Sequence, residues 1–222
     1  MTPYLWRFDV VFENLPQLLS GLWLTCLLTV LSMAIGLVGG LAVALLRLSR
    51  WRAVTLLAHA FTELFRTTPL LVQIIWIFTV MPLVAGIRLS PFFSGLVALG
   101  LNVAAYMSEI YRAGILSVGP GQTHGGLALG MTYSQTMRRI VLPQAVTRMI
   151  PPMAAMWVAL FKDTSLLATI GVAELMFQAR FLATDTFRPL EIFTVTAVVY
   201  FVLTYPQSLL VNHLFERFRV RE

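Results

Sequence analysis

Four consecutive polar residues interrupt an apolar stretch late in the chain: Lys162, Asp163, Thr164 and Ser165. A charge surrounded by hydrocarbon is costly, so ionisable residues in such a stretch are candidates for function. Neighbouring residues of a helix point to different faces, so Lys162 and Asp163 cannot simply neutralise each other. Opposite charges beside hydroxyl groups predict a pathway for a zwitterionic substrate. A structural ion pair with a neighbouring helix, or a plain helix end, is the alternative.

Two further polar residues lie in the apolar stretch over 91–114. Asn102 is near its middle, where a hydrogen bond between helices and a contact to substrate are both open. Glu109 and Arg112 are three residues apart, so they share a helix face and are expected to pair, as a structural contact or as a gate. Asn102 and Glu109 are therefore included in the predicted substrate pathway.

Residues 118–145 are rich in Gly, Gln, Thr and Ser. Gly119-Pro120-Gly121 signals a turn, and the residues after it recur near helical spacing until Pro143, which is expected to stop the helix. The segment is too polar to cross a membrane and too apolar for a solvated loop. It predicts a short helix that docks on a partner or on the chain's own bundle.

Nothing in the sequence predicts catalysis or a metal centre. Cys26 is the single cysteine and the three histidines are scattered, so neither a disulfide within the chain nor a metal cluster is expected. The pattern G-x-x-x-x-G-K-[ST], which cradles phosphates, does not occur. We expect no cofactor in this chain and no enzymatic activity of its own; ATP and Mg²⁺ would be bound by a separate subunit.

Polar residues are rare because the chain as a whole is apolar. Of its 222 residues, 58% are hydrophobic and 12% are charged, and its mean hydropathy is +0.81. A soluble domain has about 25% charged residues, and disorder requires low hydrophobicity. The sixteen Lys and Arg are scattered rather than gathered in a patch, which argues against a nucleic-acid partner. The composition predicts an all-α polytopic membrane protein.

Charged residues divide the chain into five apolar stretches, each long enough to cross about 30 Å of hydrocarbon as a helix. We expect a single transmembrane domain over 1–222, with spans near 19–46, 68–86, 91–114, 146–171 and 190–213. The segment 53–66 alternates polar and apolar residues at helical spacing. It predicts a helix lying at the membrane interface before Thr67-Thr68-Pro69 turns the chain into the second span.

Arginines predict the orientation. They gather in the loops after the first and third spans and in the tail, and such loops stay in the cytoplasm. The N-terminus is therefore expected outside and the C-terminus in the cytoplasm. The arginines concerned are Arg47, Arg50, Arg52, Arg138, Arg139, Arg148, Arg217, Arg219 and Arg221.

Four stretches of the sequence carry a resemblance to a known family. They are FRTTPLLVQ at 65–73, AAYMSEIYRAGI at 104–115, the loop at 121–131 with LPQA at 142–145, and KDTSL at 162–166. In this order they resemble the membrane (permease) subunits of ABC importers, and in particular the polar amino-acid group (histidine, glutamate, glutamine, arginine and opine permeases). The resemblance implies a type I ABC importer permease fold with five transmembrane helices and a cytoplasmic coupling helix within 118–145.

The resemblance also implies partners and a location. The partners would be ABC ATPase subunits, a second permease copy or a paralogue, an extracytoplasmic substrate-binding protein and an amino-acid substrate. The location would be the bacterial plasma (inner) membrane. An ion-coupled secondary transporter or channel subunit is the alternative, with Lys162, Asp163 and Glu109 as coupling groups. It leaves the docking segment without a role, and no internal repeat supports it.

The sequence departs from the family at the coupling helix. The family's Glu-Ala-Ala signature falls on His124-Gly125-Gly126, so a fixed negative charge is missing where the ATPase subunit is expected to dock. We expect docking to persist through shape and through the flanking contacts. The predicted docking residues are His124, Gly125, Gly126, Leu127, Gly130, Met131, Arg138 and Arg139.

Overall fold

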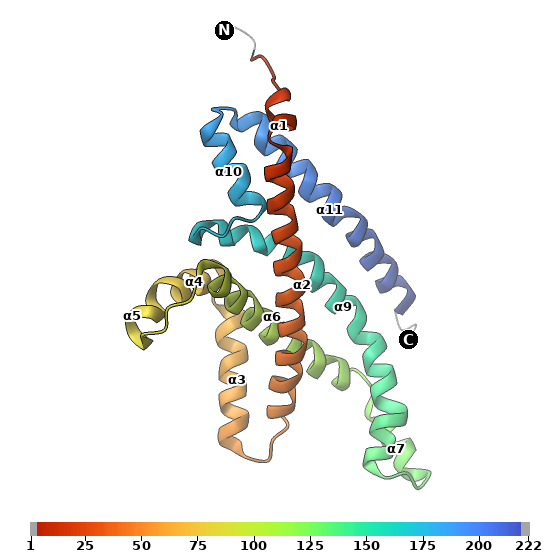
Figure 1. Cartoon of the computed structure of the whole chain (residues 1–222). Helices are drawn as coiled ribbons and strands as arrows, with labels where there is room; N and C mark the ends of the chain where they lie inside the picture. The colour runs from red at the N-terminus through yellow and green to blue at the C-terminus, as the bar shows by residue number, and fades with distance from the viewer. Residues whose placement is uncertain (1–3, 219–222) are drawn as a thin grey trace.

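The computed structural model describes residues 4–218, and every regular element in that range is helical (Figure 1). Of the predicted basic tail, Arg219 and Arg221 lie outside the described residues, as does the side chain of Arg217. The elements are α1 (Asp9–Glu13), α2 (Leu15–Leu46), α3 (Arg52–Thr67), α4 (Leu70–Ile75), η1 (Trp76–Val80), α5 (Met81–Ala85), α6 (Pro91–Leu116), α7 (Pro120–Ala128), α8 (Tyr133–Thr136), η2 (Met137–Val141), α9 (Leu142–Asp163), η3 (Thr164–Ile170), α10 (Leu175–Asp185) and α11 (Pro189–Phe218).

Within residues 4–218, four helical segments are long and apolar enough to cross a membrane: Leu15–Leu46, Pro91–Leu116, Tyr133–Ile170 and Pro189–Glu216. A fifth crossing is reached when Arg52–Thr67 and Leu70–Ala85, which meet at an angle of 109°, are taken together. Helices are required because hydrocarbon offers no partner to exposed backbone groups. The predicted all-α fold with five crossings is confirmed, and its second crossing is a bent pair of helices.

The second crossing differs from the prediction in its extent. Residues 70–85 alone would measure about 24 Å at 1.5 Å per residue, which is short for the hydrocarbon core. The predicted interfacial helix at 53–66 is instead α3, which runs back beside the lower part of α2 and supplies the missing length (Figure 1). Its bend falls at Thr68-Pro69, because the residue before a proline is held in an extended conformation.

The faces of α3 are reversed relative to a water-soluble amphipathic helix. Ala58 and Thr62 are buried against the bundle, and the Thr62 and Ser108 hydroxyls lie 3.2 Å apart. Leu57 and Leu64 are exposed. Small side chains allow close packing between helices in a membrane, where apolar side chains can face lipid instead.

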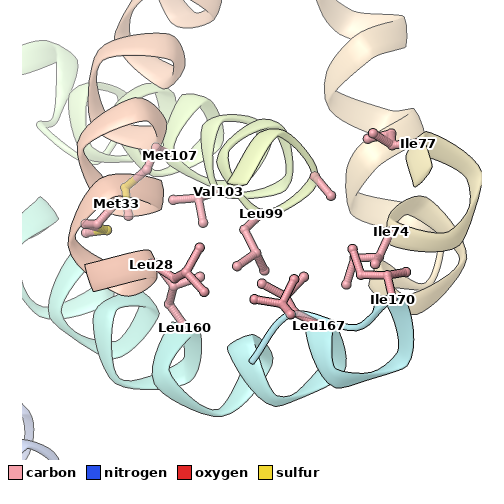
Figure 2. Packing of buried hydrophobic residues seen from close by; sticks show 12 residues of the cluster. Leu28, Met33, Ile74, Ile77, Leu99, Val103, Met107, Leu160, Leu167 and Ile170 are labelled. Atoms are coloured by element: carbon pink, nitrogen blue, oxygen red, sulfur yellow. The ribbon is translucent and has the colours of Figure 1, made fainter. Parts of the chain in front are cut away.

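Glycines bring α2 and α6 into close contact. A Cβ atom on Gly36 would lie 2.2 Å from Val103 Cγ1, and one on Gly40 would lie 2.4 Å from Met107 Cβ. Gly36 and Gly40, which are four residues apart in a G-x-x-x-G pattern, therefore allow two helices of this chain to pack closely. Beside this contact lies the main apolar cluster, to which α2, α4, α6, α9 and η3 all contribute (Figure 2).

The two ends of the bundle are distinct in Figure 1. At the upper end, the buried Glu191 accepts hydrogen bonds from the Tyr4 hydroxyl at 2.7 Å and from the Arg7 amide at 3.0 Å, which ties the N-terminal segment to α11. At the lower end lie the turn between α2 and α3 and the short helix α7. The start of α2 and the start of α11 therefore lie at the same end of the bundle (Figure 1). This agrees with four crossings between these two points and a fifth made by α11.

Candidate functional site

Two amides hold the corner where α3 turns into α4. The Gln73 side-chain amide donates to the carbonyl oxygens of Phe65 and Thr68 at 2.9 and 3.0 Å, and to the Thr68 hydroxyl at 2.9 Å. Asn102, on α6, donates to the same Phe65 carbonyl at 3.0 Å and to Gln73 Oε1 at 3.1 Å. The last carbonyls of a helix lack partners within the helix. The amides thus stabilise a break that would otherwise leave polar backbone groups unpaired inside the membrane.

A cavity of about 550 Å³ opens beside this corner. Polar lining comes from α3, the Thr67-Thr68 link, α6 and α9, and includes Arg66, Asn102, Tyr106 and Asp163. Leu70, Met156 and Ala159 provide its apolar wall. Two members of the predicted pathway, Asn102 and Asp163, are therefore brought together on one cavity.

Arg66 gives the cavity a cationic group opposite in sign to Asp163. Its guanidinium carbon lies 5.6 Å from the centre of the Tyr106 ring, within reach of a cation–π interaction. Its nearest carboxylate, on Glu63, is 4.0 Å away. The Arg66 Nε atom is buried and has no hydrogen-bond partner among the described residues. The guanidinium therefore retains the capacity to bind an anion.

Lys162 faces a different cavity from Asp163. It lines a space of about 430 Å³ together with Ser165, Thr196 and Tyr200, at the start of α11. The Thr164 and Ser165 hydroxyls donate to the carbonyls of Phe161 and Lys162 at 2.7 and 2.6 Å, within the same helix. The predicted separation of the two charges holds: Asp163 lines the first cavity, Lys162 and Ser165 line the second, and Thr164 is buried and lines neither.

Glu109 lies away from both cavities. It pairs with Arg112, as expected, and also with Arg47 at the end of α2, at 2.7 Å. A carboxylate shared by two arginines has no free lone-pair direction for a substrate cation, and here it connects α2 to α6. The pairing is confirmed; the place of Glu109 in a pathway stays a prediction.

The segment after α6 consists of two helices rather than the single helix predicted. α7 ends at Ala128, and Gly130 takes a left-handed conformation with φ of +79°, which a side chain would strain. The Thr132 hydroxyl accepts a hydrogen bond from the backbone N–H of Gln135, and the side-chain Oε1 of Gln135 accepts one from the backbone N–H of Thr132. This capping box starts α8.

The expectation that Pro143 stops the helix is wrong. Pro143 is the second residue of α9, and the preceding π-helical turn η2 accommodates its missing amide hydrogen, so one helix continues from Tyr133 to Asp163. The helix that contains the predicted fourth span therefore begins at Tyr133 rather than at 146. The continuous helix joins the turn at Gly130 to the cavity at Asp163.

Most of the predicted docking residues are exposed on this segment. His124, Gly125, Leu127 and Gly130 are exposed, and Leu129 beside them is 83% exposed. Gly126 instead faces the chain's own α8, where a Cβ would lie 2.7 Å from Thr136. The other predicted members are Met131, which is half-buried, and Arg138 and Arg139, which are exposed.

Sequence reasoning missed three parts of these sites. Arg66 enters the sequence analysis only as part of the stretch FRTTPLLVQ, although its position just before Thr-Thr-Pro puts it at the helix break. Arg47 was likewise treated only as an orientation signal. Glu174, which is fully buried, accepts from the Phe177 amide at 2.7 Å and the Tyr200 hydroxyl at 3.1 Å. Its position at the start of α10 carried no signal in the sequence, because no apolar period surrounds it.

Comparison with known proteins adds to this geometry. Residues 36–220 match the family model described as "Binding-protein-dependent transport system inner membrane component". The chain is 36% identical over 217 residues to the glutamine transport system permease protein GlnP of Escherichia coli strain K12, covering 96% of this chain and 99% of that protein. It is 40% identical over 212 residues to the L-cystine transport system permease protein TcyB of Bacillus subtilis strain 168, covering 95% and 90% of the two chains.

A solved structure gives the same result for the fold. The crystal structure of an amino acid ABC transporter with histidines contains a chain that superposes with a TM-score of 0.90 at 36% identity. The match covers 96% of this chain and 99% of that one.

Proposed function

The chain belongs to the family of binding-protein-dependent transport system inner membrane components, and from this premise we propose that it conducts polar amino acids through the cavity beside Asn102 and Asp163. It is a permease subunit of an ABC importer, with the type I permease fold that the sequence predicted. The alternative of an ion-coupled transporter or channel is not favoured. The relatives named above transport glutamine and L-cystine, which are polar zwitterions, and we carry that substrate class over to this chain.

The observation that carries the proposal is that Arg66 and Asp163, of opposite charge, line the same cavity. A zwitterion needs a cation for its carboxylate and an anion for its ammonium group, and the guanidinium of Arg66 can bind a carboxylate through two parallel hydrogen bonds. The volume of about 550 Å³ lies in the range of small-molecule sites. The cavity also adjoins a broken helix, as substrate sites of transporters often do.

The predicted pathway therefore acquires distinct roles. Asp163 and Arg66 are placed to bind the charged ends of the substrate. Asn102 shapes the corner and presents its amide to the cavity. Lys162 and Ser165 line the other cavity and Thr164 is buried, so these three residues would act on substrate only after a rearrangement of α9.

Energy must reach the cavity from the docking segment. We propose that separate ABC ATPase subunits bind ATP and Mg²⁺ and dock on α7, and that their closure moves the continuous helix from Tyr133 to Asp163. That helix is about 46 Å long at 1.5 Å per residue, so a displacement at Gly130 is transmitted to the cavity wall. Alternation between outward and inward openings would follow, with this chain performing no catalysis and holding no cofactor.

Orientation and the remaining partners complete the proposal. The docking segment and the arginines near the turn between α2 and α3 share one end of the bundle, which supports a cytoplasmic location for that end and an extracytoplasmic N-terminus in a bacterial inner membrane. An extracytoplasmic substrate-binding protein would deliver substrate at the opposite end. Because the cavity is open and α11 exposes residues such as Phe201 and Val202, a second permease copy or a paralogue is expected to close the pathway.

The test is uptake into vesicles. The chain is purified with the subunits that co-purify with it, reconstituted with ATP inside or outside, and supplied with labelled glutamine, cystine, glutamate or arginine in the presence of candidate binding proteins. We expect Asp163→Asn and Arg66→Gln each to lower uptake by at least about tenfold, since each removes a charged contact worth about 1.5–3 kcal/mol. Arg50→Gln, which removes an exposed charge outside both cavities, is the matched control and should transport normally.

Two results would oppose the proposal. Normal uptake by Asp163→Asn and Lys162→Met at normal expression would remove the charged residues from the pathway. Uptake that resists vanadate and follows only a proton or sodium gradient would remove the ATPase.

A further inference from the structure

Apart from the two cavities described above, a groove of about 1320 Å³ lies at the lower end of the bundle. Its walls are the end of α2, the start of α3, the end of α6 and the helix formed by α8, η2 and α9. Aliphatic side chains line most of it, including Leu41, Leu45, Ile115 and Val146. None of the functions proposed above uses this groove.

The groove carries a basic rim. Arg47, Arg52 and Arg112 line it, and the only carboxylate that pairs with any of them in the described part of the chain is Glu109. Glu109 binds Arg47 and Arg112, which leaves an excess of two positive charges. Arg52, exposed at the first residue of α3, has no carboxylate within 4.0 Å among residues 4–218. His59 adds an imidazole, 3.5 Å from the Arg47 guanidinium.

We propose that this groove binds an anionic phospholipid of the cytoplasmic leaflet, with its phosphate at Arg52 and its acyl chains along the aliphatic wall. An aliphatic groove that ends in Arg52, which has no carboxylate partner among residues 4–218, and in two arginines that share one carboxylate matches an amphiphile with a negative head and apolar tails. Basic pockets between helices on the cytoplasmic side are suited to acidic headgroups. The inference rests on the orientation proposed above, but lipid binding can be measured whether or not the chain transports amino acids.

Because of where the groove lies, a bound lipid would contact two parts of the fold at once. Tyr133 and Met137, on the helix that follows the docking segment, form one wall, and Leu48 and Arg52 lie on the other side. A bound lipid would therefore connect the turn between α2 and α3 to the helix that leads to Asp163. We expect an anionic lipid to stabilise this arrangement.

The experiment counts bound lipid. The full chain, with the subunits that co-purify, is reconstituted in nanodiscs of phosphatidylcholine with or without phosphatidylglycerol, and the lipids that it retains are identified by native mass spectrometry. Arg52→Gln should weaken phosphatidylglycerol retention about fivefold, as expected for one arginine near an acidic headgroup. Arg50→Gln removes the same charge two residues away and outside the groove, and should leave retention within about twofold of the unmodified chain.

A second pair of variants tests the apolar wall without changing any charge. Ala44→Trp and Val146→Trp fill the groove from opposite sides, and each should lower phosphatidylglycerol retention; either suffices if the other does not fold. Equal losses for Arg52→Gln and Arg50→Gln would overturn the proposal in favour of diffuse surface attraction, as would full retention by the tryptophan variants. Crosslinking of Leu48→Cys to a second copy or to another subunit would show that protein occupies the groove, and would also overturn it.

Discussion

Replacing Asn102 by leucine separates a structural role from a substrate contact. Asn102 donates to the Phe65 carbonyl at 3.0 Å and to Gln73 Oε1 at 3.1 Å, and it also lines the substrate cavity. If the amide serves the corner between α3 and α4, its loss will lower stability. If it serves only the substrate, its loss will lower uptake alone.

The expected magnitude follows from the bonds that are lost. A hydrogen bond between membrane helices contributes about 0.6 kcal/mol on average and at most about 1.7. Asn102→Leu removes two such bonds, but the Phe65 carbonyl keeps its bond from Gln73, so only Gln73 Oε1 is left unpaired. We expect a loss of about 1–2 kcal/mol in the free energy of unfolding.

The partner residue makes the prediction sharper. The two amide hydrogens of Gln73 are shared among the Phe65 carbonyl and both oxygens of Thr68, so Gln73→Leu removes its bonds to Thr68 and leaves the Phe65 carbonyl only its bond from Asn102. It should cost more than Asn102→Leu, about 2–3 kcal/mol. The double variant should cost less than the sum of the two single variants by about 0.5–1 kcal/mol, because the bond between the two amides is counted in both.

The assay is equilibrium unfolding in mixed micelles, followed by far-UV circular dichroism, with uptake measured on the same preparations. Ser94→Ala is the matched control, since the Ser94 hydroxyl is buried on the same helix and has no partner among the described residues. It should not lower stability. Asn102→Leu protein of unchanged stability that has lost uptake, or strictly additive single and double variants, would refute the corner role of Asn102.

Three further predictions test packing and coupling. Gly40→Val should lower the free energy of unfolding by about 1–3 kcal/mol, because the new side chain overlaps α6, whereas Gly39→Ala, with its nearest contact at 3.1 Å, should cost clearly less in the same unfolding assay. Glu109→Gln should lower the midpoint of thermal unfolding, measured by differential scanning fluorimetry, because two arginines then lose their shared anion; an unchanged midpoint would mean that the pair is not structural. Gly126→Leu should uncouple ATP hydrolysis from substrate, measured as phosphate release with and without substrate, because α7 loses its close contact with α8. Gly121→Ala, also on α7 but with open space around its Cβ, should hydrolyse and couple normally.

The crossings could be read from the sequence because the membrane imposes a strong constraint on it. A helix of about twenty apolar residues is required for each crossing, and charges mark its ends. The extents predicted for the first, third and fifth crossings agree with α2, α6 and α11 to within a few residues, apart from frayed ends. Periodicity could not reveal that the second crossing consists of two helices at 109°, because its stability depends on Gln73 and Asn102 meeting across the fold.

In the candidate site too, some features could be predicted from the sequence and others depend on tertiary packing. Lys162 and Asp163 stood out because charges are rare in apolar stretches, and their separation onto different faces followed from helix geometry alone. Which cavity each one faces depends on the packing of α6 and α11 against α9, which lies between residues far apart in the sequence. Arg66 could not be predicted for the same reason, because only the bend between α3 and α4 brings it to the cavity that Asp163 lines.

Proline departs from its usual sequence meaning in the docking segment, and the helix ends at a glycine instead. Pro143 would end a regular helix, yet the π-helical turn before it supplies a register in which its missing amide hydrogen leaves no gap, so the helix continues. Gly130, which lies inside the predicted helix, is the residue that ends it, through its φ of +79°. The helix break in the docking segment therefore lies at Gly130 instead of at Pro143. These two changes make one continuous helix of the segment between the docking turn and Asp163, and the proposed mechanism, in which movement at the docking turn becomes movement at the cavity, requires that continuity.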